Sequence, residues 1–304
     1  MKTEKIKLYE LKAVDKFLLS FPLRPERYKE LRKTLPGFPA IIVNTAGEMV
    51  FGLDYYHYLQ SKGEMAADVL RLDISDKDAL ILAYNLKDKL TDVNLYEKLV
   101  FIKKATAAVT GDGMAMALAE IYGRTALDIT VNRELLEKLG LLLSNGFRNC
   151  LMEEAVSLKS ALKLCDFLAA DRGQLIELFT AVPFSSSHQL KILEMAEEIL
   201  FREKCPLADV FEKLELRSYM DMEKPQKKII DALFRYRNPV YTAGETAWEE
   251  EIKNLNLPAH IKVTHYPFFE KRDLELTIQL KDKEALKRLV QELDLRGFTH
   301  SGSE

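Results

Sequence analysis

The sequence has few of the residues that build metal centres, disulfide scaffolds or membrane spans. It contains three cysteines and five histidines among 304 residues, and no Cys/His spacing resembles that of a zinc site. Cys150, Cys165 and Cys205 lie far apart in a region with helical periodicity, so we expect reduced, packed thiols in a cytoplasmic protein. No apolar run approaches the ~18 residues of a transmembrane helix. These absences argue against a metalloprotein, a disulfide-rich fold and a membrane protein.

An excess of positive charge is also lacking. The 44 lysines and arginines face 47 aspartates and glutamates, which gives a net charge of −3. Bulk charge therefore does not by itself indicate a nucleic-acid-binding protein. The most basic short stretch, residues 224–237, holds five cations and one acid. A phosphate contact and a solvated helix face both fit this stretch.

The remaining composition is that of a globular protein with two or three domains. Hydrophobic residues make up 47% of the chain and charged residues 30%, and the length allows a sizeable core. Strand and helix patterns alternate in residues 1–104, and residues 105–216 are helical by periodicity. Residues 217–304 hold a connector, the basic helix and a ββα unit, with strands at Ile261–Val263 and Leu274–Leu280. The pattern predicts an α+β fold.

The stretch from residue 38 to residue 63 organises the N-terminal part. Ala40–Asn44 and Met49–Phe51 read as short strands joined by a turn at Gly47, because glycine tolerates positive φ. Gly52 ends the second strand, and Leu53–Lys62 reads as a helix. A glycine between a strand and a helix allows a ligand close to the backbone, and helix N-terminal amides attract anions. An ordinary connection fits the same residues.

The middle of the chain has the outline of a helix-turn-helix. Met114–Tyr122 and Ala126–Leu139 read as helices, and Gly123–Thr125 reads as the turn between them. Many helical bundles share this outline without binding DNA. Asn132 and Arg133 suit base edges, since Asn matches adenine and Arg matches guanine. Three acids on the same predicted helix oppose its docking on a duplex.

Together these motifs resemble those of ParB-type partition proteins, whose N-terminal domain has the ParB/sulfiredoxin-like fold. In that family a strand ends in Gly-Glu-Arg-Arg, and the next helix closes with Ala-Gly or a similar pair. The segment from Gly52 to Gly63 has the same length and both terminal glycines. Asn85 stands where the family has its Glu-Asn-x-x-Arg box. The helix-turn-helix positions that match in spacing are Leu118, Ala119, Gly123, Thr125 and Ile129. The resemblance covers roughly residues 6–200.

The resemblance implies three ligands: double-stranded DNA, CTP or another nucleotide with magnesium, and a second copy of the chain. The homodimer would form through the C-terminal ββα unit, which is similar to a family dimerisation module and has little core of its own. The candidate nucleotide-binding residues are Arg24, Arg27, Gly52, Asp54, Tyr55, Asn85, Lys87 and Lys89. The candidate DNA-binding residues are Arg124, Thr125, Asn132, Arg133, Lys227 and Lys228.

The sequence departs from the family at the positions that handle triphosphate and metal. Asp54 and Tyr55 replace the paired arginines, Tyr84 replaces the glutamate and Asp88 replaces the final arginine. An aspartate beside a triphosphate repels it unless magnesium intervenes. Lys87 and Lys89 restore part of the lost charge, and Arg24 or Arg27 can serve as the family's early arginine. We therefore expect a degenerate pocket that binds another anion or none.

Three functions stay open from the sequence. The first is a DNA-binding protein of partition or transcriptional regulation, which the order of the middle and C-terminal parts favours. The second is a nucleotide-dependent enzyme of the same superfamily, similar to the free-serine kinases or the proposed nucleases. Its catalytic carboxylate would be Glu48 or Asp54. The third is a non-catalytic interaction scaffold in which both ancestral sites have decayed.

Overall fold

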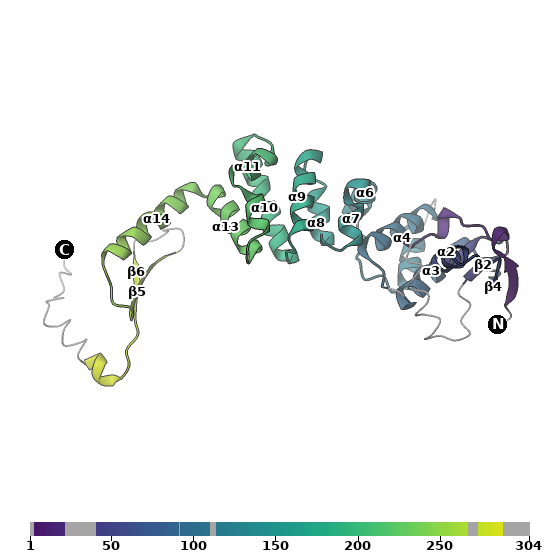
Figure 1. Cartoon of the computed structure of the whole chain (residues 1–304), viewed down its shortest axis with the longest axis horizontal. Helices are drawn as coiled ribbons and strands as arrows, with labels where there is room; N and C mark the ends of the chain where they lie inside the picture. Colours follow the sequence, from purple (N-terminus) through teal and green to yellow (C-terminus); the bar gives the residue numbers. More distant parts are fainter. Residues whose placement is uncertain (1–2, 22–40, 91, 110–113, 267–272, 288–304) are drawn as a thin grey trace. The chain divides into compact units, whose positions relative to one another are not determined.

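The computed structural model describes residues 3–21, 41–90, 92–109, 114–266 and 273–287. These residues form an α+β fold (Figure 1). Their contacts divide the chain into two compact units, Met1–Leu233 and Phe234–Glu304. The division at residues 104 and 216 stays a prediction. None of the described helices is both long enough and apolar enough to cross a bilayer.

The first unit begins with a small mixed sheet of order β1-β4-β2-β3. Its strands are β1 (Glu4–Lys7), β2 (Ile41–Asn44), β3 (Met49–Phe51) and β4 (Ala66–Leu72). β2 pairs with β4 in parallel, Ile41 opposite Val69, and the other pairs are antiparallel. All four residues of β2 are buried, so the β-branched run forms the centre of the sheet. Two short 3₁₀ helices, η1 (Leu8–Glu10) and η2 (Asp15–Phe17), follow β1.

The strand–turn–strand–helix unit predicted around Gly52 is present. Gly52 has φ 98° and precedes α2 (Leu53–Ser61), which lies beside β2 (Figure 1). Gly63 has φ 73° and ends the helix, and the amide of Glu64 donates to the carbonyl of Leu59 at 3.1 Å. This is the Schellman arrangement, which needs a residue with positive φ. The two glycines thus set the ends of α2.

Two longer helices follow, α3 (Asp76–Leu90), which packs on β3, and α4 (Leu95–Ala107), which packs on α3. Ser75 caps α3, because its hydroxyl accepts from the backbone amide of Asp78 at 3.1 Å. Asn94 and Glu97 form a complete capping box at the start of α4. Buried aromatic rings of Tyr84 and Phe101 join the two helices, with centroids 4.3 Å apart. The position of α3 and α4 is therefore fixed by both caps and core.

The rest of the first unit is helical in its described residues. The helices are α5 (Met114–Gly123), α6 (Arg133–Leu142), α7 (Asn145–Met152), α8 (Leu158–Leu164), α9 (Ala169–Ala181), α10 (Ser186–Glu203), α11 (Leu207–Lys213), α12 (Leu216–Met220) and α13 (Pro225–Arg237). α6 packs on α4, α7 and α8. Buried leucines and other apolar residues on their inner faces supply the core.

The second helix of the expected helix-turn-helix begins later than predicted. α6 begins at Arg133 and not at Ala126, because the Asn132 side chain caps it by accepting from the amide of Leu135 at 2.9 Å. The preceding run Ile129–Val131 is β-branched, which disfavours helix. Residues 124–132 accordingly form an irregular connection, longer than the turn of a typical helix-turn-helix.

The second unit contains α14 (Pro239–Asn254) and an antiparallel pair, β5 (Ile261–His265) and β6 (Leu274–Ile278). No residue of α14 is buried within the described structure. The ring of His265 lies edge-on to Trp248, and its Nε2 is 3.0 Å from Glu245. Residues 283–287 are helical, and the rest of the helix predicted there lies outside the described residues. None of the described residues of this unit is fully buried.

Two glycine substitutions with opposite expected effects on the free energy of unfolding test these backbone assignments. Gly63→Ala should lower the free energy of unfolding by about 1–2 kcal/mol, because alanine disfavours positive φ, although no atom lies within 4 Å of an added Cβ. Gly140→Ala, inside α6 and equally open, should raise it by up to about 1 kcal/mol through helix propensity. Urea unfolding of both variants measures the difference. Equal effects would contradict the assignments.

Candidate functional site

A small cavity lies beneath Gly52. Its volume is ≈ 30 Å³, and its walls come from the segment after η2, from β3, from the start of α2 and from α3. Three candidate nucleotide residues, Gly52, Asp54 and Lys87, line it together with Ser20. The structure therefore brings these three residues together, and their role in nucleotide binding stays a prediction. The volume has room for about two water molecules.

The charged groups at this cavity are buried, and other groups of the protein form hydrogen bonds or ion pairs with them. The Ser20 hydroxyl donates to the Asp54 carboxylate at 2.7 Å, and the Lys87 ammonium lies 3.3 Å from the Ser20 oxygen. Lys87 also forms an ion pair with Glu97 at 3.2 Å. Asp54 is 7% exposed, Lys87 9% and Glu97 2%. Burying charged groups is costly unless they are paired and hydrogen-bonded, and here the protein provides the partners itself.

Glu97 extends this network to the start of α4. Its carboxylate accepts from the amides of Phe21 at 2.7 Å and Asn94 at 3.1 Å. The Asn94 side chain donates to the Phe21 carbonyl at 2.7 Å. We call Ser20, Phe21, Asp54, Lys87, Asn94 and Glu97 the buried polar network. It ties the chain segment after η2 to α2, α3 and α4.

The other candidate nucleotide residues do not converge on the cavity. Tyr55 packs in the hydrophobic core beside the sheet, and Asn85 donates to the carbonyl of Arg124 at 2.8 Å. Lys89 is exposed near the end of α3. Arg24 and Arg27 lie outside the described residues. Only part of the predicted set therefore shares one location.

The described residues do not fit CTP with magnesium at this place. Pockets for ligands of that size measure roughly 300–1,000 Å³, an order of magnitude more than the ≈ 30 Å³ present. The cation that would meet a phosphate, Lys87, is paired with Glu97, and Asp54 adds negative charge. Within the described ranges no group of three or more His, Cys, Asp or Glu side chains could hold a metal ion.

The two candidate catalytic carboxylates are not arranged for proton transfer. The Glu48 carboxylate forms an ion pair with Lys16 at 2.8 Å and accepts a hydrogen bond from the side-chain amide of Asn44 at 2.7 Å. The hydrogen bond from Lys16, and then that from Asn44, lowers the pKa of Glu48, whereas a general base at neutral pH needs a pKa near 7. Asp54 accepts from Ser20 inside the buried polar network. Neither residue supports the enzyme hypothesis.

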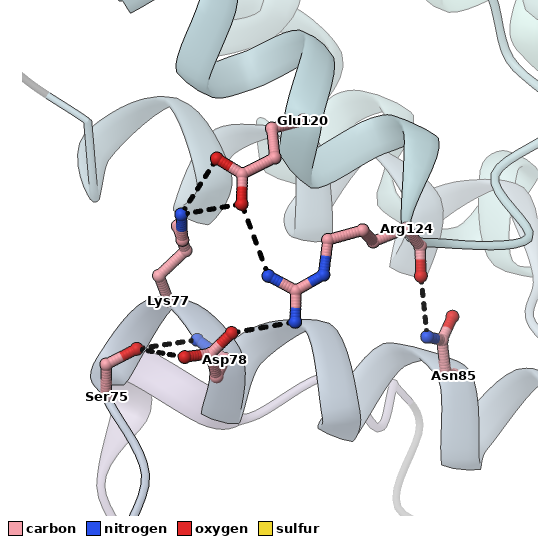
Figure 2. Close-up of polar contacts among 6 residues, drawn as sticks. All are labelled: Ser75, Lys77, Asp78, Asn85, Glu120 and Arg124. Carbon is pink, nitrogen blue, oxygen red and sulfur yellow. Dashed lines mark hydrogen bonds and ion pairs between the residues drawn. The ribbon is translucent and has the colours of Figure 1, made fainter.

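A second polar cluster joins α3 to α5 (Figure 2). The Arg124 guanidinium is 2.8 Å from Asp78 and 3.3 Å from Glu120, and Lys77 is 2.9 Å from Glu120. Asn85 completes it through its bond to the Arg124 carbonyl. We call these five residues the α3–α5 clamp. It brings together Asn85, expected at a nucleotide, and Arg124, expected at DNA.

The ionised state of the clamp follows from its own hydrogen bonds. The Ser75 hydroxyl, and then Arg124, lowers the pKa of Asp78. Lys77 lowers the pKa of Glu120, and Asp78 raises the pKa of Arg124. Asp78, Glu120 and Arg124 are therefore charged at neutral pH. Because these side chains are solvent-exposed, each ion pair by itself contributes little to stability. The role of Arg124 here is to position α5 against α3.

The remaining DNA-binding candidates are spread over three places. The Thr125 hydroxyl donates to the Tyr122 carbonyl at 2.9 Å, and the Asn132 side chain is occupied as the cap of α6. Arg133 has a 92% exposed side chain and pairs with Glu137 at 2.7 Å. Lys227 and Lys228 are exposed on α13. Of this set, Arg133 is the cation that projects from α6.

Comparison with known proteins finds similarity among solved structures only. No family model matches it, and no curated protein does. Among solved structures it is similar to a Pnob8-like ParB-N domain, with 17% identity and a TM-score of 0.37 over 62% of this chain and 95% of that one.

Two structures of the C-terminally truncated chromosome-partitioning protein ParB from Caulobacter crescentus are also similar. The complex with the centromeric parS site has 16% identity and a TM-score of 0.33, covering 63% of this chain and 98% of that one. The complex with CTP-gamma-S has 16% identity and a TM-score of 0.25, covering 59% and 99%. They belong to the group that the sequence resembles.

Breaking the buried pair should be far more costly than breaking an exposed one. Lys87→Met leaves Glu97 buried without its cation and should lower the free energy of unfolding by about 3–5 kcal/mol. Adding Glu97→Gln should recover part of the loss, because the neutral amide removes the unpaired charge. The control Lys163→Met breaks an exposed pair with Glu197 and should cost less than about 1 kcal/mol. Chemical denaturation compares the three variants, and similar losses for Lys87→Met and Lys163→Met would contradict this role.

Proposed function

We propose that this chain is a ParB-like DNA-binding protein, of partition or transcriptional regulation, whose nucleotide pocket is degenerate. The projection of α6 carries the proposal. Its inner face buries Leu135, Leu139 and Leu142, while Arg133 and Glu137 are exposed on the outer face. A helix anchored on one side and open on the other has the form needed to enter a major groove.

Arg133 is the residue best suited to a first phosphate contact. Its pair with Glu137 is fully at the surface, and such pairs are worth only ~0–1 kcal/mol. A phosphate of the duplex can replace Glu137 as the partner of Arg133. The release of condensed counterions then contributes favourably to the free energy of binding. The amino end of α6 adds the favourable end of the helix dipole. To contact a base, the Asn132 side chain would have to release the backbone amide of Leu135. We therefore assign Asn132 a role in positioning α6.

The buried polar network supports a protein that works without a bound nucleotide. Glu97 supplies Lys87 with the negative charge that a phosphate would otherwise provide. Asp54 accepts a hydrogen bond from Ser20, whose hydroxyl oxygen also lies near Lys87. The segments that such a ligand would hold together are already joined by the protein's own groups. We infer that DNA binding by this chain does not depend on CTP.

We also propose a homodimer through the second unit. The strands β5 and β6 leave Leu274 and Leu276 exposed, and α14 buries no residue within the described structure. A two-stranded sheet is marginally stable alone. A second copy would cover these apolar side chains, and binding of two half-sites would then follow from its symmetry.

An interaction scaffold is the second candidate, because the cations near α6 are largely neutralised. Lys98 pairs with Asp128 at 2.8 Å, and Lys138 pairs with Asp166 at 2.8 Å and with Glu134 at 3.1 Å. A duplex would have to compete with these acids. The salt dependence of DNA binding separates the two functions.

Fluorescence anisotropy with a mixed-sequence duplex tests the proposal. Affinity should fall roughly forty-fold between about 50 and 200 mM salt if three phosphates are neutralised. Arg133→Ala should weaken binding and reduce the salt slope by about one, and added CTP with magnesium should change neither value. The control Arg217→Ala removes an equally exposed arginine that pairs with Glu177 and should bind as the parent does. Absence of binding at low salt would favour the scaffold.

A further inference from the structure

We propose that a second hollow in the first unit binds a small organic anion with a planar ring, of about mononucleotide size. The hollow measures ≈ 510 Å³ and lies between η2, α3 and α4. Its volume is within the range of small-molecule sites. Phe17 is the only described residue that lines both this hollow and the cavity beneath Gly52. The two are therefore separate cavities.

The walls of this hollow suit a planar ring. Phe17, Phe21 and Tyr96 line it together with aliphatic side chains of α3 and α4. The rings of Phe21 and Tyr96 meet edge to face with centroids 5.5 Å apart. The Arg148 guanidinium lies 5.7 Å from the Phe21 centroid and 5.9 Å from that of Tyr96. Aromatic and cation–π contacts of this kind favour flat, electron-rich ligands.

Adjacent lysines on α4 supply the charge for an anionic group. Lys103 is exposed at the wall, and no described side chain forms an ion pair with it. Lys104 is only 14% exposed, yet its carboxylate partner Asp15, 3.4 Å away, is 87% exposed. Burial lowers the pKa of Lys104 despite the opposing effect of Asp15. The Lys104 ammonium also donates to the Asp15 carbonyl, so Lys103 is the lysine of this wall whose charge no described acid balances.

The acids at the rim pair with lysines other than Lys103. Asp76 and Glu48 both pair with Lys16, at 3.0 Å and 2.8 Å, and Asp15 is the exposed partner of Lys104 already described. A phosphate or carboxylate bound beside Lys103 and Lys104 would interact with two cations, of which Lys104 is partly desolvated. Charge-assisted bonds in such surroundings are stronger than those in water. The ring of the same ligand would lie against Phe21 and Tyr96.

Calorimetric titration with adenosine 5′-monophosphate, and separately with adenosine and inorganic phosphate, tests the inference. The monophosphate should bind at least about tenfold more tightly than either part, because each part makes only half of the contacts. No binding of the monophosphate up to about 5 mM would overturn the inference. Equal affinity of either part would overturn it as well. The titration contains no DNA, so its outcome is independent of the DNA-binding proposal.

Two variants with matched controls locate the ligand. Ala107→Phe fills the hollow from an exposed helical position and should abolish binding, whereas Ala119→Phe, at an exposed position of α5 outside the lining, should leave it unchanged. Lys103→Glu should weaken binding at least about tenfold, and Lys159→Glu, exposed on α8, should not. Undiminished binding in both Ala107→Phe and Lys103→Glu would place the ligand elsewhere and overturn the inference.

Discussion

The ion pair between Lys87 and Glu97 is the interaction on which the arrangement of the first unit depends. Both side chains are almost completely buried, and removing each charge from water costs several kcal/mol. The pair is tolerated because Ser20 and the amides of Phe21 and Asn94 complete its hydrogen bonds. These partners come from separate segments of the chain. The pair can therefore form only when the segment after η2, α3 and α4 are correctly assembled.

Helix α3 connects this network to the rest of the unit. One side carries Lys87 into the buried polar network, and residues elsewhere along it form the α3–α5 clamp with Arg124 and Glu120. The two sites differ in physical character. The network is buried and resists salt, whereas the clamp is exposed and screened by salt. The segment after η2 and α2 are thus held firmly to α3 and α4, while the contact from α3 to α5 is sensitive to ionic strength.

The sequence predicts best where local chemistry decides the structure. The β-branched run at Ile41–Asn44 and the glycines at 52 and 63 define a strand and both ends of α2, because each choice depends on a few neighbouring residues. The start of α6 was missed, since the cap formed by Asn132 outweighs the helical periodicity read from Ala126 onward. A cap signal was present in Asn132 itself.

The candidate site was predicted only in part, for a different reason. The structure brings Gly52, Asp54 and Lys87 together, whereas the sequence does not single out the partner Glu97, because the pairing is set by tertiary contacts. Asn94 and Glu97 have the spacing of a capping box, which indicates a helix start and does not indicate a buried charge. Arg124 pairs with Asp78 in the structure, and its role at DNA stays a prediction. Long-range pairs of this kind leave no trace in local spacing.

We propose that the buried polar network takes the place of a nucleotide in joining the segment after η2 and α2 to α3 and α4. Hydrogen–deuterium exchange of the amides at the start of α2 and α4, measured with and without CTP and magnesium, tests this proposal. We expect slow exchange at both places, at the same rate in the two conditions. Fast exchange in the free protein that becomes slow on addition of CTP and magnesium would refute the proposal.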